Sequence, residues 1–248
     1  MRREFNLDKR LLECANMVPQ NSKLVDIGTD HAYLPIWLVL HDIVSDAIAV
    51  DVRKEPLERA SNNIKKYGLD GKIKTRLSNG FDNLEKNECE TVVIAGMGAE
   101  TIISILDRTG WLKNCEMINL ILQPMTAAEK LRRYLSSNGY YLYLEKAVES
   151  NSKIYSVMGV KPGKEKDENL LFPYIGKIFY STPKNILEVE ASIQYAEKEI
   201  TNLLNRLKGL QVCGELYESE KLREVIQGIR KEIVNYNEKY SGNLWFYR

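Results

Sequence analysis

The sequence predicts an α/β fold in which a doubly wound, mostly parallel sheet is followed by a C-terminal helical hairpin. Short apolar runs typical of buried strands alternate with helical segments over residues 23–137, and such alternation indicates parallel strands with right-handed crossovers. Two runs of alternating residues at 140–144 and 154–160 predict an antiparallel pair that closes the sheet. Beyond residue 169 the apolar residues recur at threes and fours, which indicates long helices.

The predicted strands and helices follow one another in regular order. Strands are expected at 23–27, 46–50, 72–77, 91–95 and 117–122. Helices are expected at 7–17, 31–40, 56–67, 101–106 and 127–137. Pro56 in a first turn and Gly68 after a last turn favour the boundaries of the third helix. Ligands of such folds bind at the carboxyl ends of the parallel strands.

A polar segment at 161–169 predicts a division into two domains, 1–163 and 164–248. The second domain is expected to be helical and coiled-coil-like, with a break at 209–214 between two apolar stripes. These stripes must pack either within the hairpin or against another chain. Self-association through the C-terminal helices is therefore left open.

Composition places the chain among ordinary globular proteins. Its 248 residues are 44% hydrophobic and 28% charged, with a net charge of +1, which argues against disordered and fibrous classes. Four cysteines without a CxxC pair and two histidines predict no metal site. The first residues do not resemble a signal peptide, and no apolar run reaches the roughly 20 residues that span a bilayer. With unpaired cysteines, these features predict a cytoplasmic protein without a membrane partner.

The strongest chemical signal is an acidic glycine turn directly after the first predicted strand. Asp26, Gly28 and Asp30 lie in this segment, and Asp51 ends the next strand. Glycine lets a ligand approach the backbone, and an acid about 20 to 25 residues further on can accept the hydroxyls of an adenosine ribose. These acids would repel a pyrophosphate, whereas S-adenosylmethionine carries a sulfonium and an ammonium. The turn therefore predicts an S-adenosylmethionine site.

Residues at the ends of later strands complete the predicted pocket. Asn79 and Gly80 follow the third strand, where an amide can bond an adenine amino group, and the glycines of 95–98 open the floor of the site after the fourth. Any one of these elements alone could be an ordinary turn, but four in order at four strand ends favour a cofactor pocket. The predicted cofactor-binding residues are Asp26, Gly28, Thr29, Asp30, Asp51, Val52, Asn79, Gly80, Ala95, Gly96, Met97 and Gly98.

Residues 26–35 (DIGTDHAYLP) resemble a signature of the bacterial TrmK family, tRNA adenine-N1 methyltransferases that act in the D-loop. Residues 94–98 (IAGMG) and 120–124 (LILQP) resemble two further motifs of that family, and the resemblance covers nearly the whole chain. It implies a Rossmann-like class I methyltransferase domain at 1–163, with S-adenosylmethionine as cofactor and tRNA as partner. The implied reaction is methylation of N1 of an adenine in the tRNA D-loop.

Two positions depart from the family pattern. Ala99 stands where the family usually has glycine, and Met125 stands where an asparagine is expected after LILQP. Met125 puts in doubt a hydrogen bond from that position to the target base. Gln123 and Pro124 are left as the residues expected to line the substrate pocket.

The residues expected nearest the chemistry are Asp30, His31 and Tyr33. Adenine N1 attacks through a ring lone pair, so no general base is required, and a carboxylate that accepts the exocyclic amino hydrogen would stabilise the cationic product. Asp30 is the choice for that carboxylate, although it could instead cap the helix that follows. His31 could face the base or satisfy a turn, and Tyr33 could stack on a flipped adenine or belong to the core.

Holding a tRNA requires phosphate contacts outside the pocket. The candidates are basic residues at the start of the chain, at the domain boundary and on the hairpin; outside the hairpin they are Arg2, Arg3, Lys9, Arg10, Lys161, Lys164 and Lys166. Such charges are more often a solvated face, and the hairpin carries about as many acids as bases. Two alternative functions stay open: a class I methyltransferase that acts on a small molecule or protein, and an RNA-binding protein with a vestigial cofactor pocket.

Overall fold

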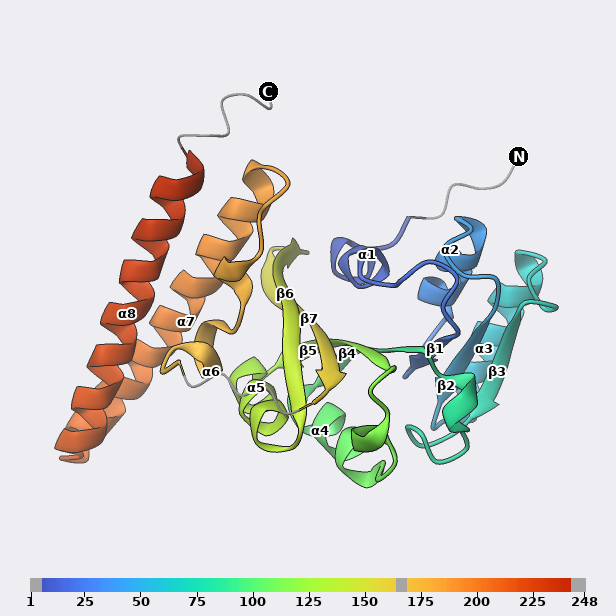
Figure 1. The fold of residues 1–248 in the computed structure, drawn as a ribbon, viewed down its shortest axis with the longest axis horizontal. Coiled ribbons are helices and arrows are strands. Elements are labelled where there is room, and N and C mark those ends of the chain that lie inside the picture. The colour runs from blue at the N-terminus through green and yellow to red at the C-terminus, as the bar shows by residue number, and fades with distance from the viewer. Residues whose placement is uncertain (1–5, 164–168, 242–248) are drawn as a thin grey trace.

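The computed structural model describes residues 6–163 and 169–241, which form one seven-stranded sheet flanked by helices and a C-terminal helical hairpin (Figure 1). The strand order is β3-β2-β1-β4-β5-β7-β6. Strands β1 to β5 run parallel, and β7 runs antiparallel to both β5 and β6. The strands are β1 (Leu24–Ile27), β2 (Ala47–Asp51), β3 (Ile73–Leu77), β4 (Thr91–Gly98), β5 (Asn119–Thr126), β6 (Tyr140–Ser150) and β7 (Lys153–Pro162). This doubly wound arrangement confirms the predicted fold class.

Helices cover both faces of the sheet. The α-helices of the described residues are α1 (Lys9–Asn16), α2 (Tyr33–Leu40), α3 (Lys54–Lys66), α4 (Ala99–Arg108), α5 (Ala128–Ser137), α6 (Phe172–Ile175), α7 (Ile186–Val212) and α8 (Leu216–Ser241). Buried residues of α1, α2 and α3 form one apolar cluster, and those of α4 and α5 form the other. Successive strand residues point to opposite faces, so Val92 and Ile94 join the second cluster while Val93 joins the first.

Several predicted elements are longer or shorter in the structure. Strand β5 continues to Thr126 and therefore contains Gln123 and Pro124, which the sequence had placed after the strand. A register shift beside Met97 accommodates the proline, because proline cannot donate a ladder hydrogen bond and is tolerated at bulges. Helix α2 begins at Tyr33 rather than at residue 31, since Ala32 adopts a left-handed conformation with φ 55°.

The C-terminal helices α7 and α8 form the predicted hairpin, with Gly214 at φ 74° in the turn between them. The apolar stripes pack against each other, as the shared cluster of Leu203, Leu207, Val225 and Ile229 shows. The short helix α6, which the sequence did not predict, adds Tyr174 and Ile175 to the same cluster. Figure 1 shows the hairpin beside the β6 edge of the sheet.

A buried ion pair joins the sheet domain to this helical part. Arg132 on α5 and Glu145 on β6 are both fully buried and 2.7 Å apart. Arg132 also donates to the Tyr195 hydroxyl on α7 at 2.8 Å and to the Tyr174 carbonyl at 2.8 Å. Glu145 accepts from the Ser156 hydroxyl at 2.6 Å. The partners in this network come from α5, α6, α7, β6 and β7, so it fixes the hairpin against the sheet.

The predicted domain boundary lies next to residues 164–168, which are outside the described ranges. Arg2, Arg3, Lys164 and Lys166, candidates for phosphate contacts, also lie outside them. Within residues 6–163 and 169–241, no helix has the length and apolar character that crossing a bilayer needs. The same residues contain no group of three or more His, Cys, Asp or Glu side chains that could hold a metal ion.

Candidate active site

The candidate site lies where the carboxyl ends of β1, β2 and β4 meet. Strand β1 is the centre of the winding, with β2 on one side and β4 on the other, and Ile27 is aligned with both Val50 and Ile94. The chain order reverses at this point, which is where open α/β sheets bind their ligands. The predicted cofactor residues on these strands are therefore brought to one edge.

The turn after β1 is closed tightly around Gly28. The backbone N–H groups of Gly28 and Thr29 both donate to the Val50 carbonyl, at 2.8 and 2.9 Å. Gly28 has φ 83°, and a Cβ atom there would lie 1.9 Å from the terminal methyl of Met97. The Thr29 hydroxyl accepts from the Ala32 N–H at 3.2 Å and so anchors the start of α2. The positive φ favours glycine at position 28, and any side chain there would also displace the end of the Met97 side chain.

Two buried carboxylates lie beside this turn. Asp26 and Asp51 are each 7% exposed. Burial raises the pKa of Asp26 to about 6, the hydrogen bond with Thr29 opposes the shift, and the negative charge of Asp51 adds to it. The Asp51 carboxylate accepts from the Arg53 backbone N–H at 2.8 Å, which orients it. The next predicted residue, Val52, is 58% exposed at the end of β2.

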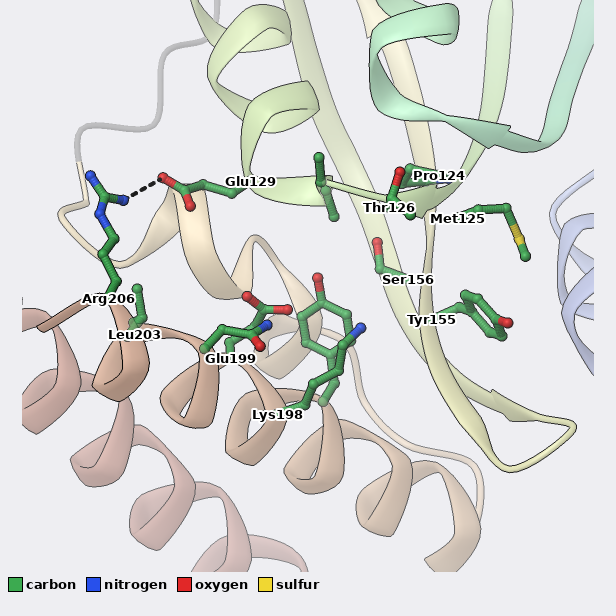
Figure 2. Close-up of a pocket in the computed structure, with 14 residues that line it drawn as sticks. Pro124, Met125, Thr126, Glu129, Tyr155, Ser156, Lys198, Glu199, Leu203 and Arg206 are labelled. Carbon is green, nitrogen blue, oxygen red and sulfur yellow. Dashed lines mark ion pairs between the residues drawn. The ribbon is translucent and has the colours of Figure 1, made fainter. Parts of the chain in front are cut away.

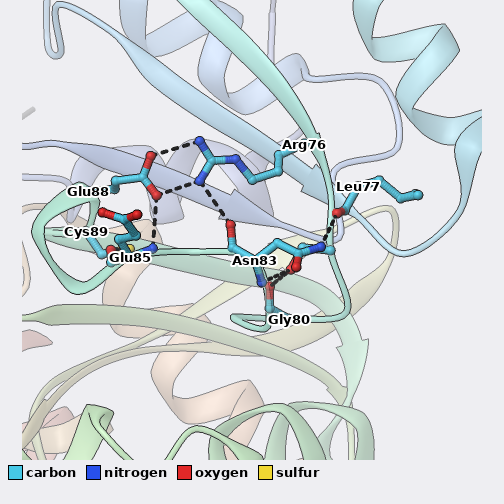
Figure 3. Close-up of polar contacts among 8 residues, drawn as sticks. Arg76, Leu77, Gly80, Asn83, Glu85, Glu88 and Cys89 are labelled. Carbon is cyan, nitrogen blue, oxygen red and sulfur yellow. Dashed lines mark hydrogen bonds and ion pairs between the residues drawn. The ribbon is translucent and has the colours of Figure 1, made fainter.

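The loop after β3 is held by a network around Arg76 (Figure 3). Arg76 forms a bidentate pair with Glu88, whose pKa is lowered to about 2 mainly by that bond. Asn83 donates from its side chain to the Leu77 carbonyl at 2.8 Å. These bonds fix the turn that carries Asn79 and Gly80. Asn79 is exposed on this turn.

Glycine is required at position 80 because φ is 65° and a Cβ atom would lie 2.8 Å from Ile105 Cγ2. The Asn79 carbonyl accepts from Arg108 at 3.3 Å. Asn79 and Gly80 therefore sit at the same sheet edge as the acidic turn, as predicted from their position after the third strand.

The end of β4 forms the floor of the site. Ala95, Met97 and Gly98 are half-buried and Gly96 is exposed, with φ 79°. The Gly96 N–H donates to the Gln123 side-chain carbonyl at 3.0 Å. The same oxygen accepts from Arg10 Nη1 at 2.7 Å, and the Gln123 amide donates to the Pro124 carbonyl at 2.9 Å.

Gln123 and Pro124 are both buried within β5, and Pro124 also borders a cleft beside helix α7. Because both ends of the Gln123 amide are bonded, this side chain orients the Gly96 turn. Contact of Gln123 or Pro124 with substrate stays a prediction. Arg10 was predicted only as a candidate for phosphate contacts and not as a residue of the pocket. Its side chain is 16% exposed and reaches the ends of β4 and β5 from α1, 113 residues away from Gln123 along the chain.

Asp30, His31 and Tyr33 lie on the outer lip of the same turn. The Asp30 carboxylate is 59% exposed, with Arg59 at 2.5 Å and His31 Nε2 at 3.2 Å. The Arg59 hydrogen bond lowers the pKa of Asp30. Tyr33 is 41% exposed and stacks on His31 with ring centroids 5.0 Å apart. The three residues predicted nearest the chemistry thus form one cluster, in which Asp30 and Tyr33 are exposed and His31 is half-buried. Helix α2 begins after Ala32 without Asp30 as its cap.

Comparison with known proteins identifies the family. A family model described as a methyltransferase domain matches residues 7–158. The tRNA (adenine(22)-N(1))-methyltransferase of Bacillus subtilis is 36% identical over 160 residues, which are 64% of this chain and 67% of that protein. M. capricolum TrmK, whose structure is known in complex with S-adenosyl-homocysteine, is 31% identical, with a TM-score of 0.71 over 92% of this chain and 97% of that one. The chain belongs to the TrmK family of methyltransferases.

A Streptococcus pneumoniae protein solved in complex with S-adenosyl-L-methionine is also similar to this TrmK-family chain. It is 31% identical, with a TM-score of 0.73 over 90% of this chain and 98% of that one. Because 90% of this chain is covered, the match extends beyond the sheet into the C-terminal helices α7 and α8. The C-terminal helices are therefore part of the architecture that the family shares.

The two departures from the TrmK pattern have different structural settings. Ala99 is fully buried at the first residue of α4, within the apolar cluster of that face, so its methyl group is accommodated by packing. Met125 is 39% exposed near the end of β5. Its sulfur lies 3.9 Å from the side-chain amide nitrogen of Gln123.

Proposed function

We propose that this protein transfers the methyl group of S-adenosylmethionine to N1 of an adenine in the D-loop of tRNA. The observation that carries the proposal is the pair of buried carboxylates, Asp26 and Asp51, beside the Gly28 turn at the switch point of a TrmK-family sheet. The similar proteins support the acceptor, since the Bacillus subtilis relative is named for adenine 22 of tRNA. The complexes with S-adenosyl-L-methionine and S-adenosyl-homocysteine support the cofactor.

The residues present fit this cofactor. Asp51, oriented at the end of β2, would accept the ribose hydroxyls, and Asp26 would face the ammonium of the methionine part. Asn79 and the 95–98 segment would border the adenine and the sulfonium. When bound, S-adenosylmethionine supplies an electrophilic methyl group on a positively charged sulfur. The excess of buried negative charge at Asp26 and Asp51 matches that cation.

The chain's contribution at the acceptor is to position the base and stabilise charge. Adenine N1 uses its ring lone pair, so no proton has to leave before transfer, and the methylated base is cationic. We propose that Asp30 accepts a hydrogen from the exocyclic amino group and so stabilises the growing charge. In the structure its partners are Arg59 and His31, so a bound base would share or replace one of these contacts. His31 and Tyr33 would complete the face against which the base lies.

Asp30→Ala should lower the methyl-transfer rate about tenfold or more while changing the cofactor Kd by less than about twofold, because the lost contact forms mainly in the transition state. Single-turnover rates with tRNA and titration with S-adenosylmethionine separate the two effects. Asp70→Ala, at another exposed carboxylate, is the matched control. A weakened cofactor with an unchanged transfer rate would reverse the assignment.

The pKa of Asp26 predicts how cofactor binding depends on pH. Only the ionised carboxylate attracts the ammonium, so Kd should rise as pH falls through about 6, approaching about tenfold per pH unit. In the protein without cofactor, the free energy of unfolding depends on pH in the opposite direction to the affinity for cofactor. The folded pKa exceeds the unfolded value, so the contribution of Asp26 is greatest below about pH 4 and is lost as pH rises to about 6.

Isothermal titration of S-adenosylmethionine between about pH 5 and 7 measures this dependence. Asp26→Asn should bind more weakly and show a flat profile over the same range. A flat profile for the unsubstituted protein would show that Asp26 does not face the ammonium.

The function itself is tested by incubating the protein with labelled S-adenosylmethionine and unmodified tRNA and identifying the methylated nucleoside by mass spectrometry. N1-methyladenosine in the D-loop is the expected product. Cofactor binding without label in RNA would favour a small-molecule or protein acceptor. Cofactor binding without turnover on any acceptor would favour an RNA-binding protein with a vestigial pocket.

We further propose a cytoplasmic location, where tRNA is modified, and a two-domain organisation divided near residue 163. The three described cysteines of the sheet domain are buried and unpaired, and Cys213 on the hairpin is exposed and unpaired, which suits a reducing compartment. Self-association through α7 and α8 stays a prediction. Their shared apolar cluster is already buried within the hairpin.

A further inference from the structure

A cleft of about 400 Å³ lies between the end of β5 and helix α7 (Figure 2). Met125 from β5 and Tyr155 from β7 lie on one side of it, and Glu199 and Arg206 come from α7 on the other. Its volume falls within the range of about 300 to 1,000 Å³ that is usual for ligand sites. Neither the cofactor residues nor Asp30 line this cleft, so the function proposed above has not used it.

The inner end of the cleft adjoins the site of methyl transfer. Pro124 lines the cleft and is aligned with Met97, whose terminal methyl group covers Gly28. The outer end follows α7, where Lys198 Nζ donates to the Ile154 carbonyl at 3.1 Å. An RNA strand whose target base reaches the cofactor can therefore continue along this cleft toward the hairpin.

The lining suits a nucleobase. The exposed Met125 and the half-buried Tyr155 offer an apolar surface, and aromatic side chains stack on any base because every base has a π-face. On the opposite side the Glu199 carboxyl bonds Asn202, and burial raises its pKa. Carboxylates accept hydrogen bonds from the exocyclic amino groups of bases, and such donors would stabilise the ionised form of Glu199.

The outer rim carries the positive charge that a phosphate needs. Arg206 is 55% exposed, and its contact with Glu129 is long, at 3.9 Å. An exposed ion pair of this kind contributes little, so the guanidinium can turn to a phosphate at small cost. Lys198, one α7 residue before Glu199, is exposed beside it.

We propose that this cleft binds the nucleotide of the tRNA that adjoins the target adenine. The base of that nucleotide would lie against Tyr155 and Met125 and donate an N–H hydrogen bond to Glu199, and its phosphate would lie near Arg206. The inference rests on the proposed function and names the part of the RNA that is held beside the site of methylation. When the target base leaves its stack, its neighbours lose a stacking partner. Tyr155 would replace that partner and lower the cost of flipping.

The test is a double-mutant cycle between protein and RNA. The kcat/KM for tRNA is measured at saturating cofactor for the unsubstituted protein, Tyr155→Ala and Tyr155→Phe, with intact tRNA and with tRNAs that are abasic on either side of the target. Tyr155→Ala should cost about tenfold and Tyr155→Phe almost nothing, because the ring is what stacks. For the unsubstituted protein, one of the two abasic tRNAs should lower kcat/KM by a similar factor. For Tyr155→Ala, the same abasic tRNA should cause no further loss of kcat/KM.

The cofactor Kd and thermal midpoint of each variant check that the fold is retained. If Tyr155→Ala does not fold, the same cycle is run with Glu199→Gln, and Glu197→Gln, an exposed glutamate on the same helix, is the control that should leave kcat/KM unchanged. If the losses of kcat/KM caused by the protein substitution and by the abasic tRNA multiply in the cycle, the cleft assignment is overturned and the methyltransferase assignment stands. An unsubstituted protein that binds cofactor but methylates no tRNA would remove both assignments.

Discussion

Asp51→Ala is expected to weaken S-adenosylmethionine binding by about 100-fold or more. A hydrogen bond to a charged group contributes about 1.5 to 3 kcal/mol, and the carboxylate can accept two ribose hydroxyls at once. Each 1.4 kcal/mol is about tenfold in Kd. The Arg53 N–H already orients the Asp51 carboxylate at 2.8 Å, so little entropy is lost when the ligand binds.

Isothermal titration gives the Kd, and Asp70→Ala serves as the exposed control. A cofactor analogue without ribose hydroxyls separates the direct contact from a folding effect: it should bind the unsubstituted protein and Asp51→Ala with similar affinity. At saturating cofactor the transfer rate of Asp51→Ala should recover, because the ribose is remote from the methyl group. A change of less than about threefold in Kd would show that Asp51 does not hold the ribose.

The sequence could predict the fold because each strand and helix carries its own periodic pattern. The acidic glycine turn and the 95–98 segment were also predictable, since parallel strands bring consecutive strand ends to one edge. The end of β5 was not. The sequence predicted that the strand ends before Gln123 and Pro124. Only the shifted pairing beside Met97 keeps β5 intact through the proline.

Contacts between distant segments left no signal in a single sequence. Arg10 lies on a short amphipathic helix, where a basic residue normally faces solvent, yet it bonds Gln123 at 2.7 Å. The pairing of Asp30 with Arg59 likewise depends on how α3 packs beside the turn. Such bonds are set by tertiary packing, so the residues could be proposed from their type but their partners could not.

The Arg132–Glu145 pair shows the same limit, and it leads to the largest expected effect on stability. Glu145→Gln should lower the free energy of unfolding by about 3 to 5 kcal/mol, because it leaves the buried Arg132 without its counter-charge. The glutamine keeps nearly the same shape, so the loss reports charge rather than a cavity. For a chain of this size the thermal midpoint should fall by roughly 10 °C.

A double variant separates the pair from general damage to the core. Arg132→Met with Glu145→Gln removes both charges, so it should be less destabilised than the sum of the single variants by about 1 kcal/mol or more. Strictly additive losses in denaturant titrations would contradict the coupling.

The position of the network also predicts a functional consequence. Arg132 bonds Tyr195 on α7 at 2.8 Å and Glu145 bonds Ser156 on β7 at 2.6 Å, and both partners line the cleft proposed to hold RNA. Tyr195→Phe keeps the ring but removes one bond, so it should leave the cofactor Kd unchanged and raise KM for tRNA by loosening α7. An unchanged KM for Tyr195→Phe would show instead that apolar contacts alone hold the hairpin, because packing of the ring would suffice to place α7.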